Sequence, residues 1–222
     1  MKTKSIQSIK GTQDILPDEV HFWQAMERKI FEEMALFGFS EIRTPAFENT
    51  DLFSRSVGEQ TDIVSKEMYT FEDRSGGSLT LKPEATASVV RAFIQHNLDK
   101  INTLTRLFYI DALFRRERPQ KGRYRQFHQF GAELFGSEHP EADVEIISLA
   151  SSIFKSIGIN EITLNKINTG NVSVRNLEKK RNKDNRRSNL RNCPLDNQIP
   201  IPLIFHKRQQ ISRFQGRGRS ET

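Results

Sequence analysis

Cysteine is nearly absent from this sequence, which has one, Cys193, among 222 residues. A single cysteine excludes an intramolecular disulfide and supplies too few thiolates for a cysteine-based zinc site. Long hydrophobic runs are also missing, since no stretch approaches the roughly 20 apolar residues that a membrane-spanning helix needs. The start of the chain lacks a secretory leader pattern. Together these features predict a soluble protein of the cytoplasm with no membrane association.

Acidic residues are scarce in one part of the chain only. The whole sequence has 34 Lys and Arg against 28 Asp and Glu, a net charge of +6. From Asn171 to Thr222 there are 13 basic and 4 acidic residues, which gives +9 there and leaves −3 for residues 1–170. The basic excess belongs to the end of the chain, so the overall charge says little about nucleic-acid binding by the remainder.

The same final segment lacks apolar periodicity. Asn176 to Asn192 consists largely of Lys, Arg and Asn, and Ile199 to Phe205 is a short apolar island. Low hydrophobicity combined with high net charge is typical of disorder. We therefore divide the chain into a folded domain, 1–170, and a basic disordered tail, 171–222. Binding of RNA phosphates by that tail is the alternative interpretation.

The remainder alternates helical and strand patterns. A helix is predicted from Pro17, followed by Asp18 and Glu19 in its first turn, to Gly38. Its apolar stripe consists of Trp23, Met26, Ile30, Met34 and Phe37. A strand at 79–81, a helix from Glu84 to about His96, a helix at 141–157 with Val144 among its inward residues, and a strand at 159–167 follow. This pattern predicts an α+β domain with a mainly antiparallel sheet.

Two predicted strands with a basic, glycine-containing loop form the centre of the domain. On the first, one apolar face consists of Phe108, Ile110, Ala112 and Phe114, and the other face of Tyr109, Asp111, Leu113, Arg115 and Glu117. On the return strand, one side consists of His128, Phe130, Ala132 and Leu134, and the opposite side of Arg125, Phe127, Gln129 and Glu133. Each strand therefore turns one face to a core and the other to polar surroundings.

The polar faces suit a nucleotide held beside an amino acid. An arginine fork pairs with phosphate oxygens, as Arg115 could, and the ring of Phe127 can stack on a purine. Glutamate and glutamine side chains can accept hydrogen bonds from an ammonium or an imidazole N–H. The alternative is a hairpin whose charged face only meets water. Glu133 could equally be the buried ion-pair partner of an arginine, and His128 belongs to the apolar face as a packing residue.

A recognisable motif favours the nucleotide interpretation. The run FRRERPQKGRYRQFHQ, from Phe114 to Gln129, resembles motif 2 of the class II aminoacyl-tRNA synthetases in its histidyl-tRNA synthetase form. The lead KGTQD from Lys10 to Asp14, and the helix after it, are similar to the opening of that family and its motif 1. In the family, this helix and a strand running to a proline, here Pro45, build a homodimer interface. The resemblance extends from about Lys10 to about Arg175.

The resemblance implies site residues, a reaction and partners. Arg115 would contact the ATP α-phosphate as the catalytic arginine, Glu117 would contact ATP near the base, and Phe127 would stack on adenine. Glu84 would meet the histidine α-ammonium with Thr86 beside it, and Gln129 and Glu133 would enclose histidine. Ala85 stands where the family often has glycine. Arg118 and Gln120 would approach the acceptor end of tRNA(His). The implied activity is ATP- and Mg²⁺-dependent ligation of histidine to tRNA(His).

Parts of that family are not seen in this sequence. A complete member would continue with an RGLDYY segment, motif 3 and an anticodon-binding domain. We therefore expect a truncated or frame-shifted product that is inactive alone, and whose tail, 171–222, is either disordered or not family sequence. A non-catalytic histidine-binding regulator of ATP phosphoribosyltransferase is the alternative function, and an inert fragment is a third. The histidines His21, His96, His139 and His206 lack ligand-like spacing, so we expect no structural metal.

Overall fold

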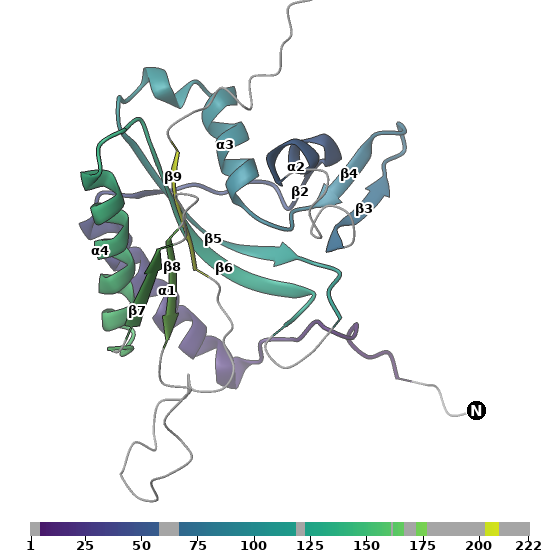
Figure 1. The fold of residues 1–222 in the computed structure, drawn as a ribbon. Helices are drawn as coiled ribbons and strands as arrows, with labels where there is room; N and C mark the ends of the chain where they lie inside the picture. The colour runs from purple at the N-terminus through teal and green to yellow at the C-terminus, as the bar shows by residue number, and fades with distance from the viewer. Residues whose placement is uncertain are drawn as a thin grey trace, which may run out of the picture.

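A computed structural model provides the three-dimensional description of the chain (Figure 1). It describes residues 5–57, 67–118 and 123–160, and the backbone of three strands at 162–166, 172–176 and 203–208. Helices and strands alternate along the chain as the sequence predicts, and the α+β class is confirmed.

The centre of the fold is a long antiparallel hairpin formed by β5 (Thr105–Phe114) and β6 (Gln126–Phe135). Its register pairs Asp111 with Gln129 and Leu113 with Phe127. Because side chains alternate across a strand, these pairs and Tyr109 share one face of the hairpin. The predicted alternation of the two faces is confirmed. The second face is not only polar, however, because Leu107, Tyr109, Leu113 and Phe135 are buried there in a second core.

The hairpin belongs to a six-stranded sheet within the described part of the chain, in the order β1-β5-β6-β9-β8-β7. The short strand β1 (Ser40–Glu41) runs parallel to β5, and β9 (Leu203–Arg208) runs parallel to β6. The strands β7 (Ile162–Lys166) and β8 (Val172–Asn176) form an antiparallel pair at the far edge.

Two of these strands fall in the segment for which disorder is predicted. Leu203–Arg208 includes part of the apolar island, and it pairs along the edge of β6, whose backbone N–H and C=O groups favour an added strand. Val172–Asn176 pairs with β7. The rest of the predicted disordered tail, including Asn192, lies outside the described residues.

The first face of the hairpin packs on two helices, α1 (Pro17–Leu36) and α4 (Glu141–Ser156). The predicted stripe of α1 is confirmed: Met26, Ile30 and Met34 are buried, and Trp23 and Phe37 pack against the same core. Gly38 ends the helix with φ +72°, a left-handed conformation that favours glycine. This face therefore forms the larger hydrophobic core.

The inward face of α4 differs from the expectation at one position. Val144 is 60% exposed, whereas Ala142, Ile146, Leu149 and Ile153 are buried. At 100° per residue, Val144 lies on the side of the helix opposite this stripe. The prediction for Val144 was wrong because helical spacing, rather than apolar character, determines which side chains meet the sheet.

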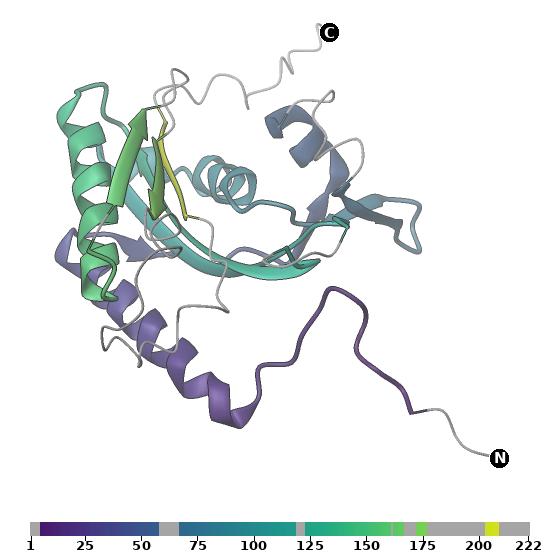
Figure 2. The ribbon, with the colours of Figure 1, turned by 60° about the horizontal axis from the view of Figure 1, so that its bottom comes forward.

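The second face of the hairpin packs on α3 (Thr86–Gln95), which Figure 2 shows lying within the concave side of the curved β5 and β6 ribbons. Val89, Val90 and Phe93 of this helix contact Leu107 and Leu113 and their neighbours in a second core. Since α3 begins over the polar part of the hairpin face, its first turn meets the side chains predicted to bind ligands.

A smaller antiparallel sheet extends from this end of the molecule (Figure 1). Its strands are β2 (Phe47–Asn49), β4 (Ser78–Leu81) and β3 (Tyr69–Glu72), in that order, and helix α2 (Thr50–Val57) follows β2. A 3-10 helix, η2 (Leu98–Lys100), connects α3 to β5. Across the described residues, no helix combines the length and apolar character needed to cross a membrane.

Candidate active site

The four predicted histidine-binding residues gather where the first turn of α3 meets β6. Gln129 and Glu133 are both fully buried, and Thr86 is 2% exposed. The Thr86 hydroxyl donates a hydrogen bond to Glu133 Oε1 at 2.7 Å. The carboxylate of Glu84 accepts one from the Ala87 backbone N–H at 2.9 Å, so it stabilises the beginning of α3 as well.

Tyr109 lies at the centre of this cluster. Its hydroxyl accepts a hydrogen bond from Gln129 Nε2 at 3.1 Å, and the residue is 1% exposed. Burial, with the nearby negative charges of Glu133 and Glu84, raises the pKa of Tyr109 well above its ordinary value, although hydrogen bonds with Thr86 and Gln129 oppose the shift. The hydroxyl therefore stays protonated and adds no negative charge beside the carboxylates of Glu84 and Glu133.

The sequence interpretation put Tyr109 on the polar face but assigned it no role. The available signal was its spacing, because Tyr109, Asp111 and Leu113 alternate toward the same side as Arg115. What the spacing could not reveal is that α3 covers this side and brings Glu84 and Thr86 to the hydroxyl. We name Tyr109 together with Glu84, Thr86, Gln129 and Glu133 the polar cluster.

One atom of the polar cluster has an unused capacity to bind. Gln129 Oε1 is buried and has no hydrogen-bond partner among the described residues. Buried acceptors are nearly always paired, and an unpaired one calls for a donor such as water or a ligand. With the carboxylates beside it, this amide oxygen suits a ligand that brings N–H groups and positive charge.

Two of the predicted ATP-binding residues contact each other. The guanidinium carbon of Arg115 lies 5.1 Å from the centroid of the Phe127 ring, within the range of a cation–π contact. Arg115 Nε donates a hydrogen bond to the Pro83 carbonyl at 2.9 Å, and its side chain is 20% exposed. That bond restricts the plane of the guanidinium and leaves its two terminal nitrogens for other partners.

The loop between the hairpin strands carries the remaining predicted contacts. Glu117 accepts a hydrogen bond from Arg123 at 3.2 Å and lies 4.0 Å from Arg115. Arg118 is exposed. Gln120, the other predicted tRNA contact, lies outside the described residues. The structure therefore brings Glu117 to Arg115.

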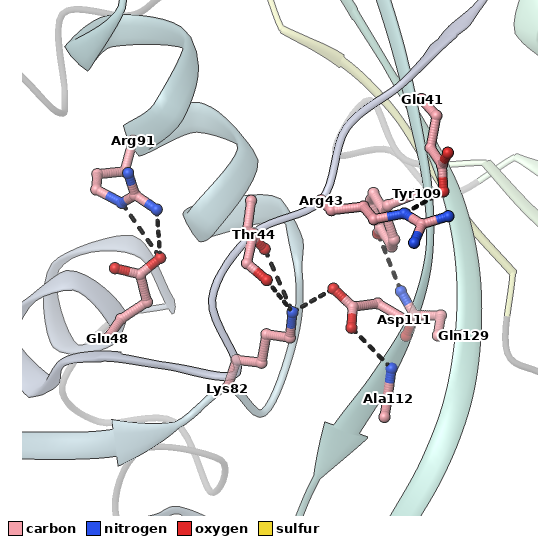
Figure 3. Close-up of polar contacts among 10 residues, drawn as sticks. All are labelled: Glu41, Arg43, Thr44, Glu48, Lys82, Arg91, Tyr109, Asp111, Ala112 and Gln129. Atoms are coloured by element: carbon pink, nitrogen blue, oxygen red, sulfur yellow. Dashed lines mark hydrogen bonds and ion pairs between the residues drawn. The ribbon is translucent and has the colours of Figure 1, made fainter.

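An ion pair between a buried lysine and a half-buried aspartate, which residue spacing did not predict, lies next to Pro83 in the chain (Figure 3). Lys82 is 1% exposed, and its ammonium pairs with Asp111 Oδ2. The same ammonium donates to the carbonyl of Thr44 at 3.1 Å and to the Thr44 hydroxyl at 3.3 Å. Lys82 thus joins the segment after β1, the end of β4 and the site face of β5.

The opposite face of the hairpin holds a histidine that is separate from the polar cluster. The ring of His128 meets Trp23 edge-on at 4.9 Å, and burial lowers the pKa of His128 despite the charges of Glu27 and Asp111. Its prediction as a packing residue is confirmed. A small hollow near these rings also borders Phe127, but none of the polar cluster lines it.

Metal-binding side chains do not gather in the parts of the chain that the structure describes. Within those ranges no group of three or more His, Cys, Asp or Glu side chains is arranged to hold a metal ion.

Comparison with known proteins decides the family. The sequence model described as histidyl-tRNA synthetase matches residues 11–193. The chain belongs to the histidyl-tRNA synthetase family. The match begins close to where the motif resemblance begins and continues past Arg175, where that resemblance was expected to end. The division of the chain at residue 170 stays a prediction.

Known relatives of this histidyl-tRNA synthetase family member each match about three quarters of the chain. A histidine–tRNA ligase from Solibacter usitatus is 51% identical over 176 residues, which is 78% of this chain and 42% of the ligase. The structure of apo S. aureus histidyl-tRNA synthetase is 39% identical, with a TM-score of 0.62 over 72% of this chain and 37% of the other. The class II synthetase-like fold is therefore confirmed.

A solved structure from Bacillus halodurans C also resembles the chain. It is described as an ATP phosphoribosyltransferase regulatory subunit/histidyl-tRNA synthetase, is 28% identical and has a TM-score of 0.62, covering 73% of this chain and 41% of that one. The chain spans between 38% and 42% of the length of the curated ligases it matches.

Proposed function

We propose that this chain supplies the histidine- and ATP-binding part of a histidine–tRNA ligase. The observation that carries the proposal is the polar cluster, in which Gln129 Oε1 is buried without a donor next to Tyr109 and the carboxylates of Glu84 and Glu133. Family membership and the ligase names of the relatives support the same activity.

Histidine is the ligand that best matches the donors and acceptors of the polar cluster. Its α-ammonium would bind the carboxylate of Glu84 near Thr86, and its imidazole would lie between Gln129 and Glu133. A buried carboxylate beside a protonated Tyr109 discriminates against anionic ligands and favours N–H donors. A ligand without such donors would leave Gln129 Oε1 unpaired and would therefore bind much more weakly than histidine.

ATP would bind at the adjoining end of the hairpin. Arg115 would hold the α-phosphate, Phe127 would stack on adenine, and Glu117 would contact the nucleotide near its base. The Pro83 carbonyl holds Arg115 Nε, so the terminal nitrogens of the fork are oriented before phosphate arrives. Mg²⁺ fits as an ion carried by the phosphates, since it commonly binds substrate phosphates and water with one or two carboxylates. Glu117 is the carboxylate available beside Arg115.

The reaction would have two steps. The histidine carboxylate oxygen attacks the α-phosphorus of ATP, the bond to the bridging oxygen breaks, and pyrophosphate leaves. The terminal ribose hydroxyl of tRNA(His) then attacks the acyl carbon and AMP leaves. Arg115 would stabilise charge developing at phosphorus in the first step. Arg118 and Gln120 would meet the tRNA acceptor end, in the cytoplasm where translation takes place.

Dimerisation is part of the same proposal. The family resemblance assigns a homodimer interface to α1 and the strand leading to Pro45. Two exposed rings on the small sheet, Phe47 and Phe71, meet at 6.4 Å and offer an apolar surface just beyond Pro45 in the chain. Sedimentation equilibrium of the chain and of a Phe47→Ser/Phe71→Ser variant tests this. A monomeric wild-type chain contradicts it.

A regulator of ATP phosphoribosyltransferase is less well supported. Arg115, Phe127 and Glu117 form a contiguous group suited to a nucleotide, and a histidine-binding regulator needs no such group. Histidine binding without ATP binding would favour the regulator.

Calorimetry on the purified 222-residue chain tests the proposed function. We expect heats for both L-histidine and Mg-ATP. Arg115→Ala should weaken ATP binding at least about tenfold, because it removes a charged hydrogen-bond donor, and should leave histidine binding within about twofold. If L-histidine or Mg-ATP fails to bind, the proposal is contradicted for this chain.

A further inference from the structure

We propose that Lys82 and Asp111 are positioning residues whose partly buried ion pair sets the orientation of Arg115 through the Pro83 carbonyl. The proposal concerns residues that touch neither histidine nor ATP in the proposed site. Its catalytic consequence rests on the proposed function, whereas its structural part is testable without any ligand.

Lys82 is held from several directions (Figure 3). Its ammonium contacts Asp111 and both oxygens of Thr44. Its backbone N–H donates to the Ala46 carbonyl at 3.0 Å, and its own carbonyl accepts from Phe114 N–H at 3.0 Å. The ammonium has three protons, and these partners account for all of them. The residue therefore has one position, defined by the segment before β2 and by β5.

The next residue transfers this position to Arg115. Pro83 follows Lys82 directly and its ring fixes φ, which removes one of the rotations between Lys82 and the Pro83 carbonyl. Holding Lys82 therefore narrows the positions that the Pro83 carbonyl can take. That carbonyl accepts the hydrogen bond from Arg115 Nε. Asp111 and Arg115 are four residues apart, so their side chains lie on the same face of β5 and of the segment that continues it. The ion pair thus connects two segments that meet at Arg115. One carries the Pro83 carbonyl, which orients the guanidinium, and the other is β5, which leads to Arg115 in the chain.

The histidine half of the site has separate support. Thr86 begins α3, whose Val89, Val90 and Phe93 are anchored in the second core. The Ala87 N–H bond to Glu84 holds the same turn. Loss of the Lys82–Asp111 pair should therefore disturb Arg115 while the hydrogen bond from Thr86 to Glu133 persists.

The test variant replaces both members of the pair with apolar residues, Lys82→Met/Asp111→Leu. Removing one member of a buried pair leaves a buried charge and is strongly destabilising, whereas replacing both is often nearly neutral. The double variant therefore separates loss of orientation from loss of folding. Thermal unfolding by circular dichroism reports folding. Lys82→Gln/Asp111→Asn, which keeps the approximate size of both side chains and leaves no buried charge, is the second variant if the first double variant gives no cooperative transition.

The chain offers a matched control in the same region. Arg91 on α3 pairs with Glu48 on β2 at 2.6 Å, and this pair is also partly buried (Figure 3). The control variant is Arg91→Met/Glu48→Leu. It removes an ion pair between neighbouring elements and leaves Lys82, Pro83 and Asp111 unchanged.

The direct measurement is hydrogen exchange of the Arg115 Nε–H in ¹⁵N-labelled protein, with the signal assigned by its absence in Arg115→Lys. We expect exchange at least about tenfold faster in Lys82→Met/Asp111→Leu than in wild type, because the bond to Pro83 opens more often, and unchanged exchange in the control. Unchanged exchange in a folded Lys82 and Asp111 variant overturns the proposal.

Calorimetry adds the functional consequence. We expect the ATP dissociation constant of the double variant to rise about tenfold and the histidine dissociation constant to change less than about twofold. Equal weakening of both ligands would indicate a general structural role and would overturn the positioning role. If the wild-type chain binds neither ligand, the proposed function fails, and the exchange of Arg115 still decides whether Lys82 and Asp111 orient it.

Discussion

The hydrogen bond from Thr86 to Glu133 provides the sharpest prediction about the polar cluster. Thr86→Val keeps the shape of the side chain and removes the hydroxyl that donates to Glu133 Oε1 at 2.7 Å. Thr86 is 2% exposed and Glu133 is fully buried, so water cannot readily replace the donor. The buried carboxylate is left with weaker compensation for its desolvation.

The magnitude follows from the charge on the acceptor. A hydrogen bond to a charged group contributes about 1.5–3 kcal/mol, so we expect Thr86→Val to lower the free energy of unfolding by about that amount. For a chain of this size, this corresponds to a fall in Tm of roughly 3–12 °C. Histidine affinity should fall about tenfold, because Glu133 loses the donor that orients it.

Differential scanning calorimetry and histidine titration measure the two effects. Thr86→Ser is the control, since it retains the hydroxyl and removes one methyl group, a change worth less than about 1 kcal/mol. If Thr86→Val matches Thr86→Ser in both Tm and histidine affinity, the hydroxyl does not orient Glu133 and the reasoning is refuted.

Four further substitutions test the titration of two buried side chains and the conformation of two glycines. Because burial raises the pKa of Tyr109, its contribution to stability is complete below about pH 10 and is lost as the pH rises toward the folded pKa; Tyr109→Phe should remove this alkaline loss, up to about 1.4 kcal/mol per pH unit in urea unfolding. Burial lowers the pKa of His128, so its contribution to the free energy of unfolding is present above about pH 6.5 and declines at lower pH. If the stability of a His128→Gln chain falls as steeply in acid as that of wild type, this prediction is contradicted. Gly136 has φ +91°, and an added Cβ would lie 1.9 Å from the Thr103 carbonyl oxygen, so Gly136→Ala should destabilise by at least about 2 kcal/mol in chemical unfolding. Gly38→Ala, with φ +72° and open space, should lose only about 1 kcal/mol, and equal losses at both glycines would refute the steric argument.

The local features of the fold were predictable from residue spacing. The stripe of α1 and the two faces of the hairpin follow from periods of 3.6 and 2. The burial of Met26, Ile30 and Met34 and the register of Asp111 with Gln129 agree with those periods. Val144 shows the limit of judging by residue type, since its spacing on α4 already assigns it to the exposed side.

The contacts between distant segments were not predictable in this way. Nothing in the spacing of Lys82 indicates that Asp111 and Thr44 lie around its ammonium, because these residues belong to three separate elements. The role of Tyr109 in the polar cluster was not predictable for the same reason, since α3 must cover the hairpin before Thr86 can hydrogen-bond with Tyr109. Arg115 could be singled out because it belongs to a recognisable motif of consecutive residues. A contact between distant segments produces no such run of residues in the sequence.

Nuclear magnetic resonance of bound histidine tests the central claim most directly. With labelled L-histidine on the 222-residue chain, we predict nuclear Overhauser effects between the imidazole protons and the ring of Tyr109, and a shifted Gln129 side-chain amide signal. Effects that instead connect the ligand to Trp23 and His128, at the hollow on the other face of the hairpin, would contradict the assignment of the polar cluster as the histidine site.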